Sequence, residues 1–314
     1  MHKVFEGNTV DVTTVCSTAN SIKKQLNINT CMLILDRGMV SENNLIYLDK
    51  ERFGYIVGLS KSWKTTKDLI IEAKNFEVVD EEKEIYAQES IRLHNGKKKK
   101  YVVFLSKEKQ KEDRERREKA LKQKIGELNK LKARIEKGKL KNRDSIVMKI
   151  GEIIKDARKY FIIKHGKDKL EFDFSLNKLI LAKEEELDGK YVVCCTDVDM
   201  SAKEILLAYR DKDKAEKAFR TIKCFIKIRP IRHWKENRVK AHIFLCILAY
   251  LLKKVLEYKL QLKGLKMTAE EALNELAGIK MVSYQVGDTV VEKATKIDEK
   301  QRLILEKLGY WPFK

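Results

Sequence analysis

Short apolar runs alternate with amphipathic stretches over the first 60 residues of the chain. The runs at 32–35 and 55–59 are four to five residues long and end in polar or glycine-containing segments, which is typical of buried strands. Ser41 has the side chain and position of a helix N-cap. The pattern predicts a strand at 2–5, a helix at 13–26, a strand at 32–35, a helix at 42–50 and a strand at 55–59. This alternation indicates an α/β sheet.

One long charged segment, residues 107–141, dominates the middle of the chain. Its apolar side chains recur at spacings of three and four, at Leu121, Ile125, Leu128, Leu131 and Ile135. This spacing predicts one apolar stripe on a long helix, and the stripe is short for a coiled coil, so packing within the same chain is favoured over dimerisation. The surrounding pattern predicts a strand at 101–105, a helix at 145–157, and strands at 160–163, 170–174, 179–182 and 191–195.

From Ser201 to its end the chain is predicted to be almost entirely helical. Ser201 and Glu204 have the spacing of a capping box. The apolar pattern then predicts helices at 237–262, 268–276 and 298–308.

The balance of charge favours a polyanionic partner. Sixty-seven Lys and Arg residues against 47 Asp and Glu residues give the 314-residue chain a formal net charge of +20. Such an excess is typical of proteins that bind nucleic acid, although a lysine-rich soluble protein can share it.

Cellular location and redox state follow from the apolar runs and the cysteines. The longest apolar run, 243–252, is shorter than the roughly 20 residues that span a bilayer, and the N-terminus lacks the apolar core of a signal peptide. The six cysteines include no C-x2-C pair, which favours reduced, buried thiols over a zinc site. A cytoplasmic protein with no membrane partner is therefore expected.

Two acidic residues are the candidates for chemistry. Asp36 ends the predicted strand at 32–35, and Glu216 lies on a helix that places Tyr209, Lys212 and Lys223 within an arc of about 60°. Carboxylates on separate elements can hold divalent ions, with lysines binding phosphate beside them. The spacing alone favours a plainer interpretation, an exposed helix face with an i,i+4 pair between Lys212 and Glu216.

The motifs around these residues resemble those of bacterial and archaeal insertion-sequence DDE transposases. Residues 209–252 resemble the C-terminal signature Tyr-x2-Arg-x3-Glu-x6-Lys, with Lys212 in place of the usual arginine. Residues 35–39, LDRGM, resemble the second-Asp motif, and residues 5–11, FEGNTVD, resemble the turn that follows the first-Asp strand. The resemblance implies a partial RNase H-like (retroviral-integrase-like) core of α/β class.

The resemblance also implies how the chain is divided. Residues 1–61 would be the N-terminal part of the core, without its first strands. Residues 62–195 would be a mixed helical and β insertion that contains the long charged helix. Residues 196–314 would be the helical C-terminal part of the core, which carries Glu216.

The function implied is cut-and-paste DNA transposition and recombination. Such an enzyme hydrolyses phosphodiester bonds and transfers strands at transposon ends, with double-stranded DNA of the ends and the target as its partner and a homodimer as a further candidate. Asp36 and Glu216 would be the catalytic ligands of Mg²⁺ or Mn²⁺, in a two-ion site of the intact enzyme. The resemblance assigns DNA contacts to Tyr209, Lys212 and Lys223. A basic strip that includes Arg229, Arg232 and Arg238 is a further candidate for phosphate binding.

The departure from the family pattern lies at the first catalytic Asp. Asp11 is the nearest candidate, but it falls after the expected position, where a turn or cap role is favoured. We therefore expect a truncated transposase that is inactive alone, with a non-catalytic DNA-binding or transposase-inhibiting remnant as the alternative. Strand edges left without a neighbour would favour association or poor solubility.

Three further features are open at the level of sequence. The four lysines at 97–100 could contact phosphate or form a solvated turn. His242 is predicted to be a partly buried histidine with a hydrogen-bond partner rather than a catalytic group. Trp234 could stack on an extruded base, although a core or surface role is favoured. Gly54 and Gly58 do not form a phosphate-binding loop.

Overall fold

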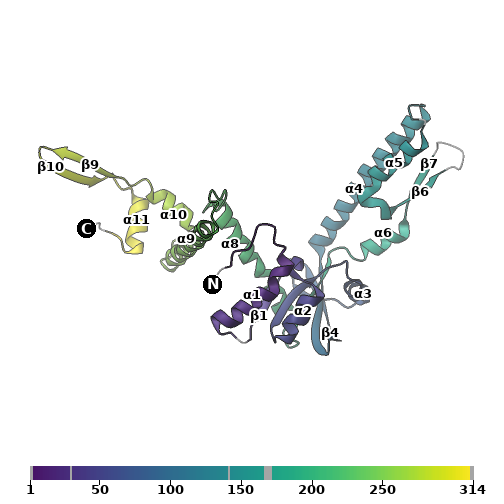
Figure 1. Ribbon diagram of the computed structural model, residues 1–314, viewed down its shortest axis with the longest axis horizontal. Helices are drawn as coiled ribbons and strands as arrows, with labels where there is room; N and C mark the ends of the chain where they lie inside the picture. The colour runs from purple at the N-terminus through teal and green to yellow at the C-terminus, as the bar shows by residue number, and fades with distance from the viewer. Residues whose placement is uncertain (1–2, 29, 141, 166–171, 312–314) are drawn as a thin grey trace. The chain divides into compact units, whose positions relative to one another are not determined.

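The computed structural model describes residues 3–28, 30–140, 142–165 and 172–311. Its contacts divide the chain into two compact units. The first, here called the sheet unit, comprises residues 7–212. The second, here called the C-terminal unit, comprises the described residues among 1–6 and 213–314. Both helices and strands are present, as the sequence predicts (Figure 1).

The sheet unit is built on a six-stranded mixed sheet with the order β1-β2-β8-β5-β4-β3. β1 and β2 are parallel, and every other neighbouring pair is antiparallel. The strands are β1 (Met32–Leu35), β2 (Gly54–Leu59), β3 (Glu77–Asp80), β4 (Ile85–His94), β5 (Lys97–Ser106) and β8 (Lys190–Cys195). One sheet therefore joins strands from both sides of residue 61, where the sequence suggests that an insertion begins.

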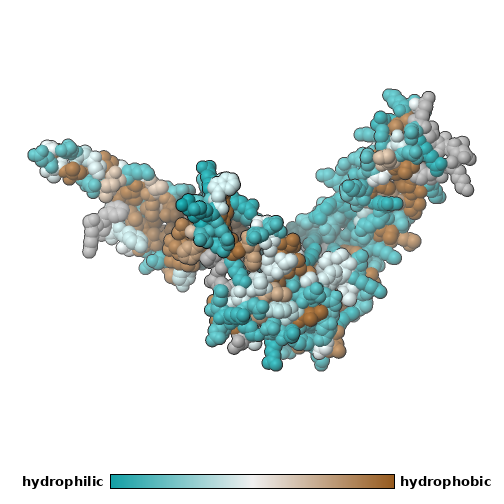
Figure 2. All heavy atoms as spheres, viewed as in Figure 1, coloured by the Kyte–Doolittle hydropathy of each residue, from teal (hydrophilic) through white to brown (hydrophobic). Residues whose placement is uncertain are grey.

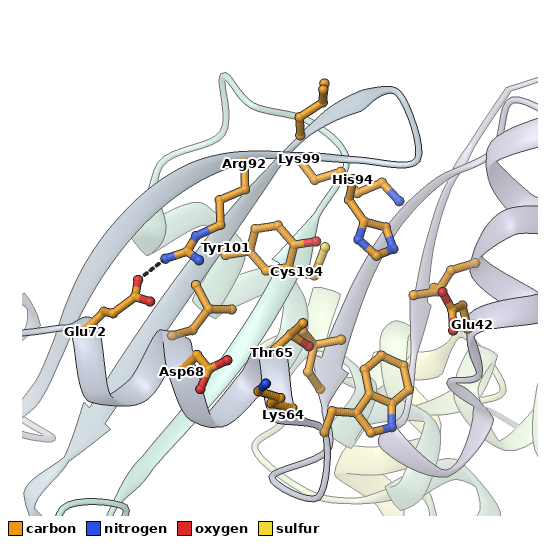
Figure 3. A pocket seen from close by; sticks show the side chains of 15 residues that line it. Glu42, Lys64, Thr65, Asp68, Glu72, Arg92, His94, Lys99, Tyr101 and Cys194 are labelled. Atoms are coloured by element: carbon orange, nitrogen blue, oxygen red, sulfur yellow. Dashed lines mark hydrogen bonds and ion pairs between the residues drawn. The ribbon is translucent and has the colours of Figure 1, made fainter.

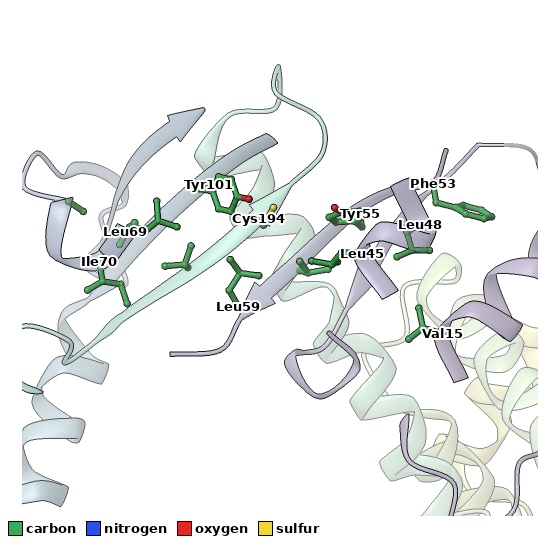
Figure 4. Packing of buried hydrophobic residues seen from close by; sticks show 14 of the residues in the cluster. Val15, Leu45, Leu48, Phe53, Tyr55, Leu59, Leu69, Ile70, Tyr101 and Cys194 are labelled. Atoms are coloured by element: carbon green, nitrogen blue, oxygen red, sulfur yellow. The ribbon is translucent and has the colours of Figure 1, made fainter. Parts of the chain in front are cut away.

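Helices cover both faces of this sheet. On one face α1 (Asp11–Leu26), α2 (Glu42–Lys50) and α3 (Lys64–Glu72) pack over a core that includes Leu48, Tyr55 and Ile70 (Figure 4). On the other face α7 (Ala202–Arg210) packs over a second core. Because side chains alternate along a strand, neighbouring residues of β8 contribute to opposite cores.

The adjacent cysteines of β8 show this alternation. Cys194 belongs to the core under α1–α3 and Cys195 to the core under α7, and each is free. Burial raises the pKa of Cys194 to about 12. These are inert structural thiols, as the sequence predicts.

The long charged helix is confirmed as α4 (Lys107–Glu136), and it leads from the sheet into an arm, here defined as residues 107–185 (Figure 1). Its apolar stripe packs on the same chain, as predicted, through Leu121, Leu128 and Leu131. The other elements of the arm are α5 (Arg143–Ile154), the 3-10 helix η2 (Lys155–Tyr160), β6 (Phe161–His165), β7 (Phe172–Leu176) and α6 (Lys178–Glu185).

The strand predicted at 179–182 is wrong, because these residues belong to helix α6. The Asn177 side chain accepts a hydrogen bond from the Ile180 N–H and caps this helix. A four-residue apolar run has no periodicity that separates strand from helix, so the cap decides the conformation.

The arm is anchored to the sheet at its root by charged contacts. Arg117 pairs with Asp188 at 2.6 Å, and Asp113 accepts a hydrogen bond from the Gly189 N–H. Gly189 has a φ of +67°, and a Cβ there would lie 2.5 Å from the Ser106 carbonyl oxygen. Only glycine allows the chain to pass at this point.

The C-terminal unit contains α9 (Glu236–Leu262), α10 (Ala269–Leu276) and α11 (Glu299–Leu308), which contact one another, and most of α8 (Lys212–Cys224). Thr268 caps α10 with a capping box, and Gly309 ends α11 in the left-handed conformation. Figure 2 shows apolar residues gathered on the visible surface around α9 and α10. None of the helices in the described part of the chain is long and apolar enough to cross a membrane.

The expectation of an almost wholly helical C-terminal part is wrong for residues 281–294. These form a hairpin of β9 (Met281–Val286) and β10 (Thr289–Ala294), joined by a turn at Gly287, which has a φ of +58°. The Gly-Asp turn between two runs rich in valine is the signal for this hairpin.

The strand predicted at 2–5 is also wrong for its described residues. Residues 3–5 form no strand, and His2 lies outside the described residues. A short apolar run becomes a strand only where a neighbouring strand can satisfy its backbone groups.

Candidate functional site

The candidate site begins where β1 ends. Asp36 follows Leu35 and caps the short 3-10 helix η1 (Arg37–Met39), with its Oδ1 accepting a hydrogen bond of 2.8 Å from the Arg37 N–H. Because β1 and β2 are parallel, their carboxyl ends meet at one edge of the sheet. Asp36 therefore lies at the same edge as the segment that follows Leu59.

Lys212 reaches Asp36 across 176 residues of sequence. Its Nζ lies 2.8 Å from Asp36 Oδ1, the oxygen that also accepts the Arg37 N–H. This hydrogen bond from Lys212 is the main cause that holds the pKa of Asp36 below its ordinary value. The carboxylate is 59% exposed, so the ion pair fixes its orientation more than it stabilises the fold.

Tyr209 supports Lys212 from the last turn of α7. The Lys212 ammonium lies 5.0 Å from the centroid of the Tyr209 ring, in cation–π geometry. The Tyr209 side chain in turn lies over Gly58 of β2, where a Cβ would collide with its hydroxyl and lie 3.0 Å from its Cζ. Asp36, Tyr209 and Lys212 thus form one cluster in the sheet unit.

Gly58 of β2 leaves room for the Tyr209 ring of this cluster, and the sequence alone assigns it no role. A glycine inside a strand marks either a bulge or a close approach of another group. Here it marks a close approach, because the Tyr209 ring occupies the space of the missing side chain.

The remaining candidate residues belong to the C-terminal unit. Glu216 and Lys223 are exposed on α8, Arg229 and Arg232 are exposed in the segment between α8 and α9, and Arg238 is exposed in the first turn of α9. Exposed cations of this kind can reach the phosphates of a polyanion.

Two aromatic residues near these cations have different surroundings. Trp234 is fully exposed, so it is a surface rather than a core tryptophan. The His242 Nε2 lies 3.1 Å from the Ile228 carbonyl oxygen and donates to it. The prediction of a partly buried histidine with a hydrogen-bond partner is therefore confirmed.

The lysine run at 97–100 is mainly structural. Lys99 is buried, with its Nζ 2.7 Å from Asp49 Oδ2 and 2.6 Å from the Tyr55 hydroxyl. Lys100 is also buried and pairs with Glu89 at 2.9 Å. These two side chains are not available to phosphate.

A cavity of about 510 Å³ lies under α2 and α3, on the face of the sheet that these helices cover (Figure 3). Tyr101 and Cys194 of the sheet line it, together with Trp63, and an ion pair between Arg92 and Glu72 lies at its border. Cations and carboxylates are balanced among its lining residues, so it has no charge preference for a phosphate.

The fit of the chain to a divalent metal can be tested on these residues. Magnesium and manganese ions take several oxygen ligands. Within neither unit do the described residues bring together three His, Cys, Asp or Glu side chains that could hold a metal ion. The Asp36 carboxylate is paired with the Lys212 cation rather than with a second carboxylate. The described residues of the sheet unit therefore do not form a metal centre by themselves.

Comparison with known proteins gives one match. A family model described as "Transposase DDE domain" matches residues 1–252, which is most of the chain. No curated protein and no solved structure gives a significant match.

Proposed function

Because the chain belongs to the transposase DDE domain family, we propose that it binds the DNA of insertion-sequence ends as part of a cut-and-paste transposition system. The observation that carries this proposal is the Asp36 cluster, in which a carboxylate at the end of a strand pairs with the lysine of the Tyr-x2-Lys motif and the tyrosine of the motif contacts that lysine. The fold is of the RNase H-like type under this proposal, and the mixed sheet with Asp36 at the end of β1 supports it.

Catalysis in this family generally uses divalent metal ions, which activate the attacking water and stabilise the leaving oxygen. Asp36 and Glu216 are the ligands that this chain offers under the proposal. Neither unit completes a metal centre from its described residues, so we assign no catalytic step to the chain alone. The chain by itself is then a DNA-binding protein that can occupy transposon ends, which is the alternative that the sequence left open.

The DNA contacts follow from exposure and charge. Lys223, Arg229, Arg232 and Arg238 are exposed, and the chain carries a net charge of +20. Lys212 is a further candidate, since its ammonium group lies beside Asp36 at the edge of the sheet. Backbone contacts of this kind give affinity without base recognition.

Replacement of Arg229, Arg232 and Arg238 together by glutamine is expected to weaken duplex binding roughly uniformly across sequences. Each lost phosphate contact should reduce the magnitude of the slope of log K against log salt by about 1. The triple variant should therefore reduce this magnitude by about 3. The measurement is fluorescence anisotropy of a labelled duplex over a range of salt concentrations.

The matched control removes the same charge from the exposed face of the arm. The variant Lys119→Gln, Lys122→Gln, Lys130→Gln should bind with nearly the wild-type salt slope. Equal losses of affinity and of salt slope in the two triple variants would show that DNA binding depends on net charge alone. That result would remove the basis for a defined DNA contact.

A further inference from the structure

A second cavity, of about 640 Å³, lies at the root of the arm within the sheet unit. Its size falls in the range of about 300–1,000 Å³ that ligand sites occupy. Its lining comes from the segment after β2, from α3, from residues 113–124 of α4, from η2 and from the end of α6 with the residues that follow it. Six cationic side chains take part: Lys61, Lys67, Arg116, Arg117, Lys124 and Lys159.

Two of these cations are neutralised by close partners. Arg117 pairs with Asp188 at 2.6 Å, and Lys159 pairs with Glu184 at 2.7 Å. These pairs account for two of the four acidic residues that line the cavity.

Two other cations of the lining have looser partners. Arg116 lies 3.8 Å from Asp113, and Lys124 lies 3.9 Å from Glu127. Arg116 and Glu127 are exposed, and pairs with an exposed member at such distances contribute little, so Arg116 and Lys124 are available to another anion.

Lys61 is held by a carbonyl oxygen rather than by a carboxylate. Its Nζ donates to the Leu187 carbonyl oxygen at 2.7 Å, and no carboxylate of the described residues is in ion-pair contact with it. Burial lowers the pKa of Lys61, while Asp113 and Asp188 favour its charged form from a greater distance and Lys109 and Arg37 oppose it.

Lys67 and Asp156 are the remaining charged residues of the lining. Lys67 also makes no ion pair with a described carboxylate, and Asp156 is the acid of the lining that has no described cation in contact. With the paired residues set aside, the cavity presents Lys61, Lys67, Arg116 and Lys124 against Asp113 and Asp156. It therefore favours an anion.

The position of Lys61 relates this cavity to the candidate site. Lys61 follows the end of β2, at the edge of the sheet where β1 ends in Asp36. Its charge also interacts with that of Arg37, the residue next to Asp36. A strand of DNA that passes Asp36 would meet the root of the arm at this edge.

We propose that the cavity at the root of the arm binds a backbone phosphate of DNA, with Lys61 as the main ligand and Lys67, Arg116 and Lys124 at its rim. A half-buried ammonium group without a carboxylate is costly to the free protein, and a phosphate oxygen compensates that cost. The inference rests on the proposed function, because a phosphodiester is the anion that a DNA-binding member of this family meets.

The test compares two half-buried lysines of the same unit. Lys61→Met should weaken duplex binding about threefold to tenfold at low salt, reduce the salt slope by about 1 and leave the melting temperature equal or higher. Lys190→Met is the control: burial lowers the pKa of Lys190 as well, and its ammonium lies 5.5 Å from the Phe76 ring, but it does not line the cavity. This control should bind DNA as the wild type does.

A lower melting temperature for Lys61→Met with wild-type DNA binding would show that Lys61 only holds the Leu187 carbonyl, and the inference would be overturned. If Lys61→Met does not fold, the rim variant Lys67→Gln, Lys124→Gln replaces it, and wild-type binding by this variant would overturn the inference equally.

Titration of the wild-type chain and of Lys61→Met with inorganic phosphate separates this inference from the proposed function. Wild-type chain that binds phosphate through Lys61 but binds no DNA would support the anion site and contradict the DNA-binding function. Wild-type chain that binds DNA with no dependence on Lys61 and does not bind phosphate would contradict the anion site and leave the function standing.

Discussion

Lys99→Ala is expected to destabilise the sheet unit by about 3–5 kcal/mol, the range found when one partner of a buried ion pair is removed. Lys99 is 1% exposed, and its Nζ contacts both the Asp49 carboxylate and the Tyr55 hydroxyl. Without the ammonium group, Asp49 of α2 stays buried with an uncompensated charge. Chemical denaturation of the variant and the wild type measures this loss.

Lys98→Ala is the matched control for this experiment. Lys98 is the neighbouring residue of β5 and is exposed, so its replacement should change the free energy of unfolding by no more than about 0.5 kcal/mol. The double variant Lys99→Met, Asp49→Leu removes both charges, so its free energy of unfolding should fall much less than that of Lys99→Ala. Equal losses for Lys98→Ala and Lys99→Ala would show that the buried pair is absent in solution.

Gly189→Ala should be the second severe substitution. Left-handed backbone strain and overpacking should lower the free energy of unfolding by about 2–4 kcal/mol. Gly189 has a φ of +67°, and its new Cβ would lie 2.5 Å from the Ser106 carbonyl oxygen and 2.7 Å from the Gln110 nitrogen. Both obstacles are backbone atoms, which cannot move aside as a side chain end can. Thermal unfolding followed by circular dichroism measures the loss.

Gly126→Ala, inside the arm, provides the contrast. Gly126 lies inside α4, where a Cβ would meet no atom within 4 Å, so alanine should raise stability by up to about 1 kcal/mol through its helix propensity. A Gly189→Ala protein as stable as Gly126→Ala would contradict the described path of the chain at the root of the arm.

The elements that the sequence predicted well have strong local signals. Ser201 forms the capping box that its spacing with Glu204 suggests, and the apolar stripe of α4 packs as expected. Two elements that the sequence did not predict depend on strand pairing or on a helix cap. The β9–β10 hairpin is exposed on nearly all its residues, and α6 starts at an asparagine cap beside a short apolar run.

For the candidate site, the sequence predicted positions but not contacts. Asp36 stands at the end of its strand as predicted, because a short apolar run followed by Asp-Arg-Gly is a local signal. The pairing of Lys212 with Asp36 joins residues 176 positions apart, and no local pattern reveals it. The sequence gives no local signal for the surroundings of Lys61 either, because its hydrogen-bond partner Leu187 is distant in the sequence.

We propose that this member of the transposase DDE domain family binds DNA, and its described residues do not complete a metal centre within either unit. The experiment that tests this proposal incubates the purified chain with supercoiled plasmid DNA and Mg²⁺ or Mn²⁺, and follows both complex formation and nicked circles. We expect binding with no nicking above that of the Asp36→Ala and Glu216→Ala controls. Metal-dependent nicking by the wild-type chain that disappears in both controls would contradict it.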